Sequence, residues 1–157
     1  MKKNNYPSWL VPVKIAKKLK KIGFNTNTLF FYNEEEEPKI MFGLNTFEEV
    51  DGQSDLEIGQ LQFYQEADME SYEYILPTWE QVLEWFRNKK IYGNVNQSWE
   101  YRKYDSPRGL NYFYIINDCR KKNIKETEAI WNGGFDIYED AREELVNKLI
   151  KLYENNV

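Results

Sequence analysis

Two groupings of charged residues have a spacing that could support chemistry. Glu80 and Glu84 are four residues apart, so a helix would place both carboxylates on one face, where they could bind a metal ion or transfer protons. The segment "EEEEPK" contains a Glu-x-Lys, a pattern that metal-dependent nucleases carry on a strand. Here the middle residue is Pro38 in a predicted hairpin tip, where the backbone is not held rigidly around two metal ions. Since no Asp or His lies near Glu84 to complete a site, we expect a solvated helix face and no bound metal.

The residue types that are missing exclude the commonest catalytic designs. The chain has no His and a single Cys, Cys119, which excludes His-based triads, His metal ligands, Cys-rich zinc sites and an internal disulfide. No segment has the Gly-x-x-x-x-Gly-Lys pattern of a phosphate-binding loop. We therefore expect a protein that is not an enzyme and that binds no cofactor.

Aromatic and basic residues interleave in "SWEYRKYD" and in the region after "LNYFYII". Sheets that bind single-stranded nucleic acid present stacking rings beside Lys and Arg. Alternate residues of Trp99–Tyr104 point to opposite faces of a strand, so one packed face and one solvated face explain the same pattern. The net charge of −5 disfavours phosphate, so nucleic-acid binding is the alternative function. Its candidate residues are Tyr101, Arg102, Lys103, Arg120, Lys121 and Lys122.

Charge is distributed in blocks along the chain. Residues 1–25 carry seven Lys and no acid, whereas residues 26–84 carry fifteen acids and one Lys. Such blocks either neutralise one another inside the fold or form a field that steers a charged partner. For the second case, the candidate partner-binding residues lie in predicted loops and hairpin tips. They are Glu34, Glu35, Glu36, Glu37, Glu48, Glu49, Asp51 and Asp55.

Two helices are predicted before residue 90. One runs over 12–22 and ends at Gly23, where a left-handed cap belongs. The other runs over 79–89 and begins with Thr78 and Gln81 in a capping box. We read the second helix as a core anchor rather than a working site, because its apolar residues form a wide stripe.

A third helix is predicted over 137–153, with Asp136 and Glu139 as an acidic capping box. Together with the second helix it should supply much of the core. The residues expected to be largely buried are Trp79, Val82, Leu83, Trp85, Phe86, Ala141, Leu145 and Leu149.

The predicted strands cluster between the helices instead of alternating with them. They cover 28–33 and 39–44 as a hairpin, then 57–65, 91–95, 98–105, 110–118 and 126–131. Turns are expected at Asn96-Gln97, at "SPRG" and at "NGG". This order indicates an α+β fold, a single domain over 1–157 in which a mainly antiparallel sheet has helices packed on one face. A chain of 157 residues fits one domain of ordinary size.

Nothing in the sequence indicates a membrane segment. The chain has no run of about 18 apolar residues, and charges occupy the N-terminal stretch where a signal peptide would be apolar. We expect a soluble protein of the cytoplasm. The oligomeric state is left open.

Three segments resemble a group of small uncharacterised proteins from phages and mobile elements of gut Bacteroidetes. They are a lysine-rich helix ending in Gly-Phe, a Pro-Thr-Trp helix, and a terminal helix that begins Tyr-Glu-x-Ala. Where the group continues Arg-Glu-Lys, this chain has Arg87, Asn88 and Lys89. The matching residues are Lys18, Leu19, Gly23, Phe24, Pro77, Thr78, Trp79, Val82, Trp85, Arg87, Tyr138, Glu139 and Ala141.

The resemblance implies a context rather than a site. It implies a non-catalytic accessory protein that acts in the host cytoplasm by binding a host protein, such as a host defence enzyme. The acidic block could then occupy a basic channel built for nucleic acid and speed association with that partner.

Overall fold

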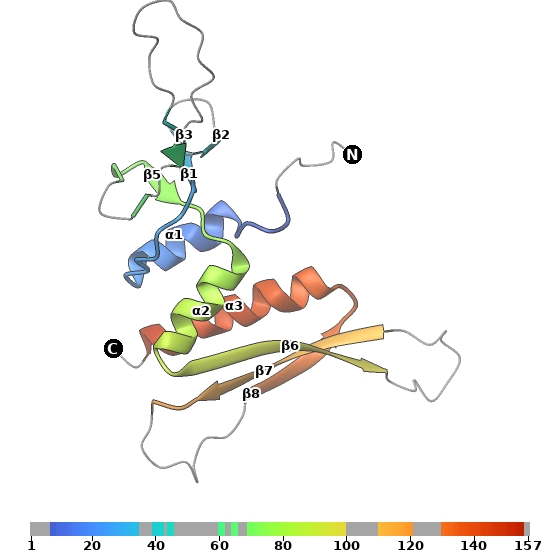
Figure 1. Ribbon diagram of the computed structural model, residues 1–157. Helices are drawn as coiled ribbons and strands as arrows, with labels where there is room; N and C mark the ends of the chain where they lie inside the picture. Colours follow the sequence, from blue (N-terminus) through green and yellow to red (C-terminus); the bar gives the residue numbers. More distant parts are fainter. Residues whose placement is uncertain are drawn as a thin grey trace, which may run out of the picture. The chain divides into compact units, whose positions relative to one another are not determined.

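The computed structural model describes residues 7–34, 39–42, 44–45, 60–61, 64–65, 69–99, 110–120 and 130–155. Within these residues the chain forms three helices and strands that pair only in antiparallel fashion (Figure 1). The predicted α+β class is confirmed, although the described strands form three sheets rather than one. Two compact units can be distinguished, Met1–Trp79 and Glu80–Val157, and each is described by itself. The single-domain boundary of 1–157 stays a prediction.

The first helix is amphipathic, as its spacing predicts. α1 (Val13–Lys21) buries Ile15, Ala16 and Leu19. Gly23 follows it at a φ of +77°, a left-handed conformation that glycine adopts without strain. Both the helix and its cap are therefore confirmed.

The predicted hairpin forms two strands of a three-stranded sheet in the first unit. β1 (Phe30–Asn33) pairs with β2 (Lys39–Phe42) on one side and with β5 (Glu73–Ile75) on the other. The sequence did not reveal β5, because three residues are too few to display an alternating pattern.

The strand predicted over 57–65 is confirmed only in part. β4 (Gln60–Leu61) pairs with β3 (Leu44–Asn45) in a separate two-stranded sheet. Tyr64 instead forms an isolated bridge with the buried Thr28, with backbone hydrogen bonds of 2.9 and 2.8 Å. Residues 57–59 and 62–63 of the predicted strand lie outside the described residues.

The segment before α1 pairs with the segment before α2 (Trp79–Asn88). The Val11 N–H donates to the Pro77 carbonyl at 3.0 Å, and Leu10 and Thr78 form a bridge. The indole Nε1 of Trp79 donates to the Ser8 carbonyl at 2.9 Å. This bond supplies the hydrogen-bond partner that a buried Trp requires.

α2 is a core helix, which confirms the prediction for this segment. It buries Trp79, Val82, Trp85 and Phe86. Leu83 is only half-buried, so the expectation of a largely buried side chain is wrong at this position. The reason is geometric, because each residue advances about 100° around a helix and Leu83 therefore lies to one side of the stripe.

The second unit contains a three-stranded antiparallel sheet. Its strands are β6 (Ile91–Trp99), β7 (Leu110–Asp118) and β8 (Ile130–Phe135), with β7 in the middle. The strand predicted over 110–118 is confirmed as β7. The one predicted over 91–95 continues to Trp99.

The turn predicted at Asn96-Gln97 is wrong. Asn96 lies opposite Phe113 and Gln97 opposite Tyr112 in an uninterrupted ladder between β6 and β7. Asn favours turns, but pairing along the whole of β7 outweighs this local preference. Ser98 and Trp99, the first two residues of the strand predicted over 98–105, are strand residues but belong to β6, and 100–105 lies outside the described residues.

The turn predicted at "NGG" is also wrong, because β8 runs through it to Phe135. Tyr112 pairs with Phe135 and Phe113 pairs with Gly133, which leaves Gly134 as the extra residue of a β-bulge. Gly134 has a φ of +92°, which explains why a glycine is placed there. The glycines that suggested a turn thus form a bulge within the strand.

α3 (Tyr138–Glu154) packs on one face of this sheet (Figure 1). Its N-cap is Ile137, with no side-chain capping bond, so the predicted box of Asp136 and Glu139 is wrong. Asp136 lies one position too early to cap a helix that begins at Tyr138. Among the described residues of this unit, the buried apolar ones are Val82, Trp85, Phe86, Ile91, Tyr114, Ile116, Ala141, Leu145, Val146, Leu149 and Ile150.

Candidate functional site

The face of the β6–β7–β8 sheet opposite to α3 is composed of amide and apolar side chains. Residues alternate between the two faces of a strand, and Ile91, Gly93 and Ile116 are buried on the face toward α3. The residues between them belong to the other face. We give the name amide–aromatic face to six exposed or half-buried residues of this surface: Tyr92, Asn94, Asn96, Phe113, Ile115 and Asn117.

The register of β6 and β7 sets each amide against an apolar side chain. The three cross-strand pairs are Tyr92 with Asn117, Asn94 with Ile115, and Asn96 with Phe113. Directly opposed residues in an antiparallel ladder have Cβ atoms about 4.5–5.5 Å apart. Each of the three asparagines therefore has an apolar or aromatic side chain as its cross-strand neighbour.

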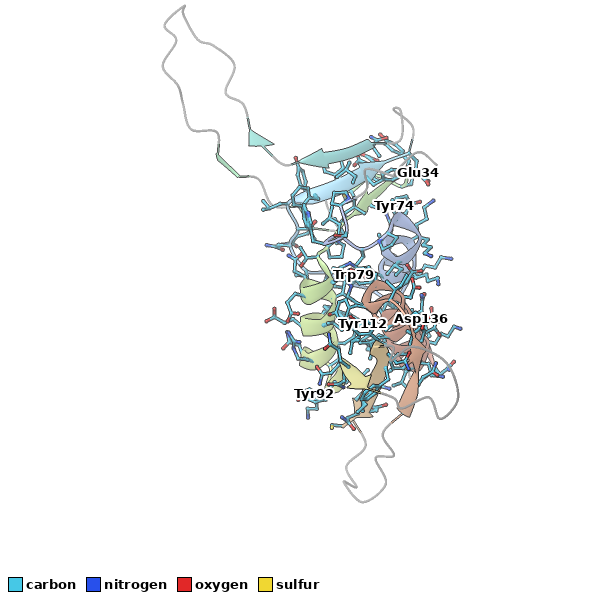
Figure 2. All side chains as sticks on the ribbon, turned by 90° about the vertical axis from the view of Figure 1, so that its right-hand side faces the viewer. Glu34, Tyr74, Trp79, Tyr92, Tyr112 and Asp136 are labelled. Atoms are coloured by element: carbon cyan, nitrogen blue, oxygen red, sulfur yellow. The ribbon has the colours of Figure 1, made fainter. Side chains whose placement is uncertain are left out.

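This face is accessible to a partner at several points. Tyr92 is 42% exposed (labelled in Figure 2), and the three asparagines are exposed. Phe113 and Ile115 are half-buried. The exposed ring and amides thus lie beside less accessible apolar side chains, as polar rim residues lie beside the apolar centre of a protein interface.

None of the six side chains of the amide–aromatic face is charged, in a chain of which 30% is charged. Protein–protein interfaces are depleted in charged residues at their centre and enriched in aromatic ones. Tyr and Asn are also frequent in the binding loops of antibodies, because rigid rings supply contact area and amides supply adaptable hydrogen bonds. The composition is therefore typical of a recognition surface.

One residue of the predicted acidic surface, Glu34, lies among the described residues, and it is exposed. Its carboxylate pairs with the Lys17 ammonium of α1 and accepts a hydrogen bond from the Tyr74 hydroxyl at 3.4 Å (Figure 2). The hydrogen bond to Glu34 holds the pKa of the Lys17 amine above its ordinary value. Lys20 donates to the carbonyls of Glu70 and Glu73, at 3.4 and 3.2 Å.

These contacts bring the basic first block of the sequence against the acidic second block. Part of the charge of the two blocks is therefore neutralised within the fold, which is one of the two alternatives expected from the sequence. The other members of the predicted surface lie outside the described residues, and their role stays a prediction. They are Glu35, Glu36, Glu37, Glu48, Glu49, Asp51 and Asp55.

Arg120, a candidate for binding nucleic acid, takes part in an intramolecular clamp. Its guanidinium donates to both carboxylate oxygens of Asp118, at 2.8 and 2.7 Å, and to the Leu152 carbonyl at 3.2 Å. The bonds to Asp118 raise the pKa of Arg120 above its ordinary value. These contacts give Arg120 a role in fixing the end of β7 against α3. The other candidates lie outside the described residues: Tyr101, Arg102, Lys103, Lys121 and Lys122.

The carboxylates of α2 lie at the protein surface. Glu80 pairs with Arg87, and both Glu80 and Glu84 are exposed. In the part of the chain that the structure describes, no three His, Cys, Asp or Glu residues gather closely enough to hold a metal ion.

The sequence contained a signal for the amide–aromatic face. Ile91, Gly93 and Val95 alternate with Tyr92 and the asparagines of β6, which is the period of a half-buried strand. Reading Asn96-Gln97 as a turn interrupted this period and concealed the face.

Comparison with known proteins found no match, since no protein-family model, no curated protein and no solved structure matches the chain. Of the helices that the structure describes, none combines the length and the apolar character needed to cross a membrane.

Proposed function

We propose that this chain is a non-catalytic accessory protein of phage or mobile-element type that binds a host protein through the amide–aromatic face. The observation that carries the proposal is the composition of this face, where six side chains include two rings and three amides but no charge. Removing water from such a surface costs little free energy except at the amides, and a partner can offset that cost by forming hydrogen bonds with them. The phage context rests on the sequence resemblance.

The same composition favours a protein over a nucleic acid as the partner. Single-stranded nucleic acid is bound by rings that stand beside Lys and Arg, because the cations neutralise the phosphates. The amide–aromatic face has rings but no cation, and the net charge of −5 adds repulsion. Nucleic-acid binding through residues outside the described part of the chain stays the alternative.

Loss of the Tyr92 ring should weaken binding to the host partner about tenfold or more, because an exposed Tyr in an interface is a frequent hot spot. The experiment uses tagged full-length chains carrying Tyr92→Ser or Tyr138→Ser to capture proteins from a host lysate, with quantification by mass spectrometry. Tyr138 is a matched control, since it is 39% exposed against 42% for Tyr92 and lies on α3. Circular dichroism would verify that both variants are folded.

The expected result is a host protein that is captured by the wild type and by Tyr138→Ser but not by Tyr92→Ser. Equal capture by both variants would show that the partner uses another surface. Recovery of abundant chaperones and ribosomal proteins alone would count against the proposal as a whole.

The acidic block has a separate role in this proposal, which is to accelerate the encounter with a basic partner such as a defence enzyme that binds nucleic acid. Changing Glu34, Glu35, Glu36 and Glu37 together to Gln should slow association about tenfold at low salt and reduce its salt dependence. Surface plasmon resonance at several salt concentrations measures both quantities. A matched control removes four exposed carboxylates from α3 instead: Glu139, Asp140, Glu144 and Glu154. Equal slowing by both sets would indicate a net-charge effect without a specific acidic surface.

A further inference from the structure

β6 is an edge strand, and one side of its backbone is unused among the described residues. The sheet order places β7 on one side of β6 and no described strand on the other. Within the ranges that the structure describes, Ile91–Trp99 forms backbone hydrogen bonds only with β7. The strand has nine residues, whereas strands most often have about five or six. No described residue therefore pairs with the N–H and C=O groups on the outer side of β6, where another chain could pair.

β6 lacks the features by which proteins usually protect an exposed edge. Charged side chains, prolines and bulges prevent edge strands from pairing with other chains. The sequence "IYGNVNQSW" contains no charge and no proline, and the β6–β7 ladder has no bulge. The opposite edge, β8, has a bulge at Gly134. Of the two edges, β6 is thus the one suited to accept a further strand.

The sequence of β6 is complementary to itself. If two copies of β6 pair antiparallel about Val95, Asn94 of one copy lies opposite Asn96 of the other, and Gly93 lies opposite Gln97. Side-chain amides have both donors and acceptors, so opposed asparagines can bond to each other. Since none of the nine residues is charged, the pairing sets no like charges against each other. Two copies with a net charge of −5 each repel one another, and an interface formed by an uncharged strand keeps this repulsion low.

We infer that two copies of this chain pair through β6, in antiparallel register centred on Val95. The pairing joins two three-stranded sheets into one continuous sheet. Directly opposed residues of antiparallel strands point to the same face, so the α3 helices of both copies lie on one face of this sheet. The two amide–aromatic faces then lie side by side on the other. This inference does not depend on the proposed function, because it concerns the purified chain alone.

The register predicts which charges the interface tolerates. Asn94→Lys combined with Asn96→Lys places lysine opposite lysine twice across the two-fold axis. Asn94→Lys combined with Asn96→Glu instead places each new lysine opposite a new glutamate. Both positions are exposed, so neither double variant should disturb the fold of the single chain. The two variants change the same residues and differ only in the sign of one charge.

Sedimentation equilibrium of the purified full-length chain tests this inference. We expect the wild type to form a particle of twice the 19.0 kDa of one chain. The dissociation constant should rise about tenfold or more for the lysine–lysine variant and much less for the lysine–glutamate variant. An equal mixture of Asn94→Lys/Asn96→Lys with Asn94→Glu/Asn96→Glu should restore the dimer. Hydrogen exchange should report new protection in β6 on dimerisation and none in β8.

A wild-type chain that stays monomeric at all concentrations would overturn the inference. β6 would then be available to pair with a strand of a different protein. A dimer that tolerates lysine at both positions would overturn it as well. Equal dissociation of the two double variants would refute the register centred on Val95.

Discussion

Replacing Trp85 with alanine should lower the free energy of unfolding by about 3–5 kcal/mol. Trp85 is 6% exposed, and its ring centroid lies 5.0 Å from that of Phe86 and 5.1 Å from that of Tyr153. Alanine would remove the ring and leave a cavity between α2 and the last turn of α3, where the surrounding side chains relax only in part. Trp85 thus joins α2 to α3 through an aromatic contact with Tyr153.

Urea denaturation followed by circular dichroism measures this loss. The same substitution at Trp9 is a matched control, because Trp9 is 48% exposed and makes an edge contact with Phe30 at 4.9 Å. Trp9→Ala should cost only about 0.5–1.5 kcal/mol, the value of an aromatic pair. If Trp85→Ala costs no more than Trp9→Ala, α2 does not anchor the core.

A second large effect is expected at Gly93, where valine should cost about 2–3 kcal/mol. A Cβ at this position would lie 2.8 Å from Leu145 Cδ1 and 3.2 Å from Leu149 Cδ1, and both leucines are fully buried. Glycine therefore allows α3 to approach β6 closely, at the expense of backbone entropy in the strand. The two extra methyl groups of valine would force these leucines out of their rotamers or move α3 away from the sheet.

A double-mutant cycle identifies the clash as the cause. Gly93→Ala and Leu145→Ala should each destabilise the protein, and the double variant should lose less than the two losses added together. A coupling free energy of about 0.5–3 kcal/mol is expected for residues in contact. Asn94→Ala, on the exposed face, should change stability by no more than about 0.5 kcal/mol. Additive losses at Gly93 and Leu145 would contradict the close approach.

The helices were predictable because their signals are local. In α1 and α2 the apolar residues recur at helical spacing, and Gly23 supplies the left-handed residue that ends α1. The cap of α3 was predicted incorrectly. Asp136 and Glu139 have the spacing of a capping box, but this box would start the helix one residue earlier than the observed N-cap, Ile137. Many residues together indicate that a segment is helical, whereas only one or two residues indicate where the helix begins.

The candidate site was less predictable, because a residue type does not specify its partner. Glu34 and Arg120 were both expected to present charge to another molecule. In the structure each pairs with a charge of the same chain, Lys17 and Asp118 respectively. Glu34 and Lys17 are separated by 17 positions, and only the packing of α1 beside the sheet of the first unit brings them together.

The sequence by itself determined the α+β class, the three helices, the hairpin of β1 and β2, and the exclusion of His-based chemistry, because each follows from composition or short-range periodicity. Only the tertiary structure decided that β6 continues through Asn96 and Gln97, that β8 continues through its glycines, and that Gly93 lies under two leucines of α3. Hydrogen bonds to β7 stabilise β6 and β8 as strands against the local preference of their Asn and Gly residues for turns. The partners in β7, and the leucines of α3 that contact Gly93, are not neighbours of these residues in the sequence. The amide–aromatic face exists only because β6 and β7 are joined in that register, which puts Tyr92, Asn94 and Asn96 on the side of the sheet away from the core.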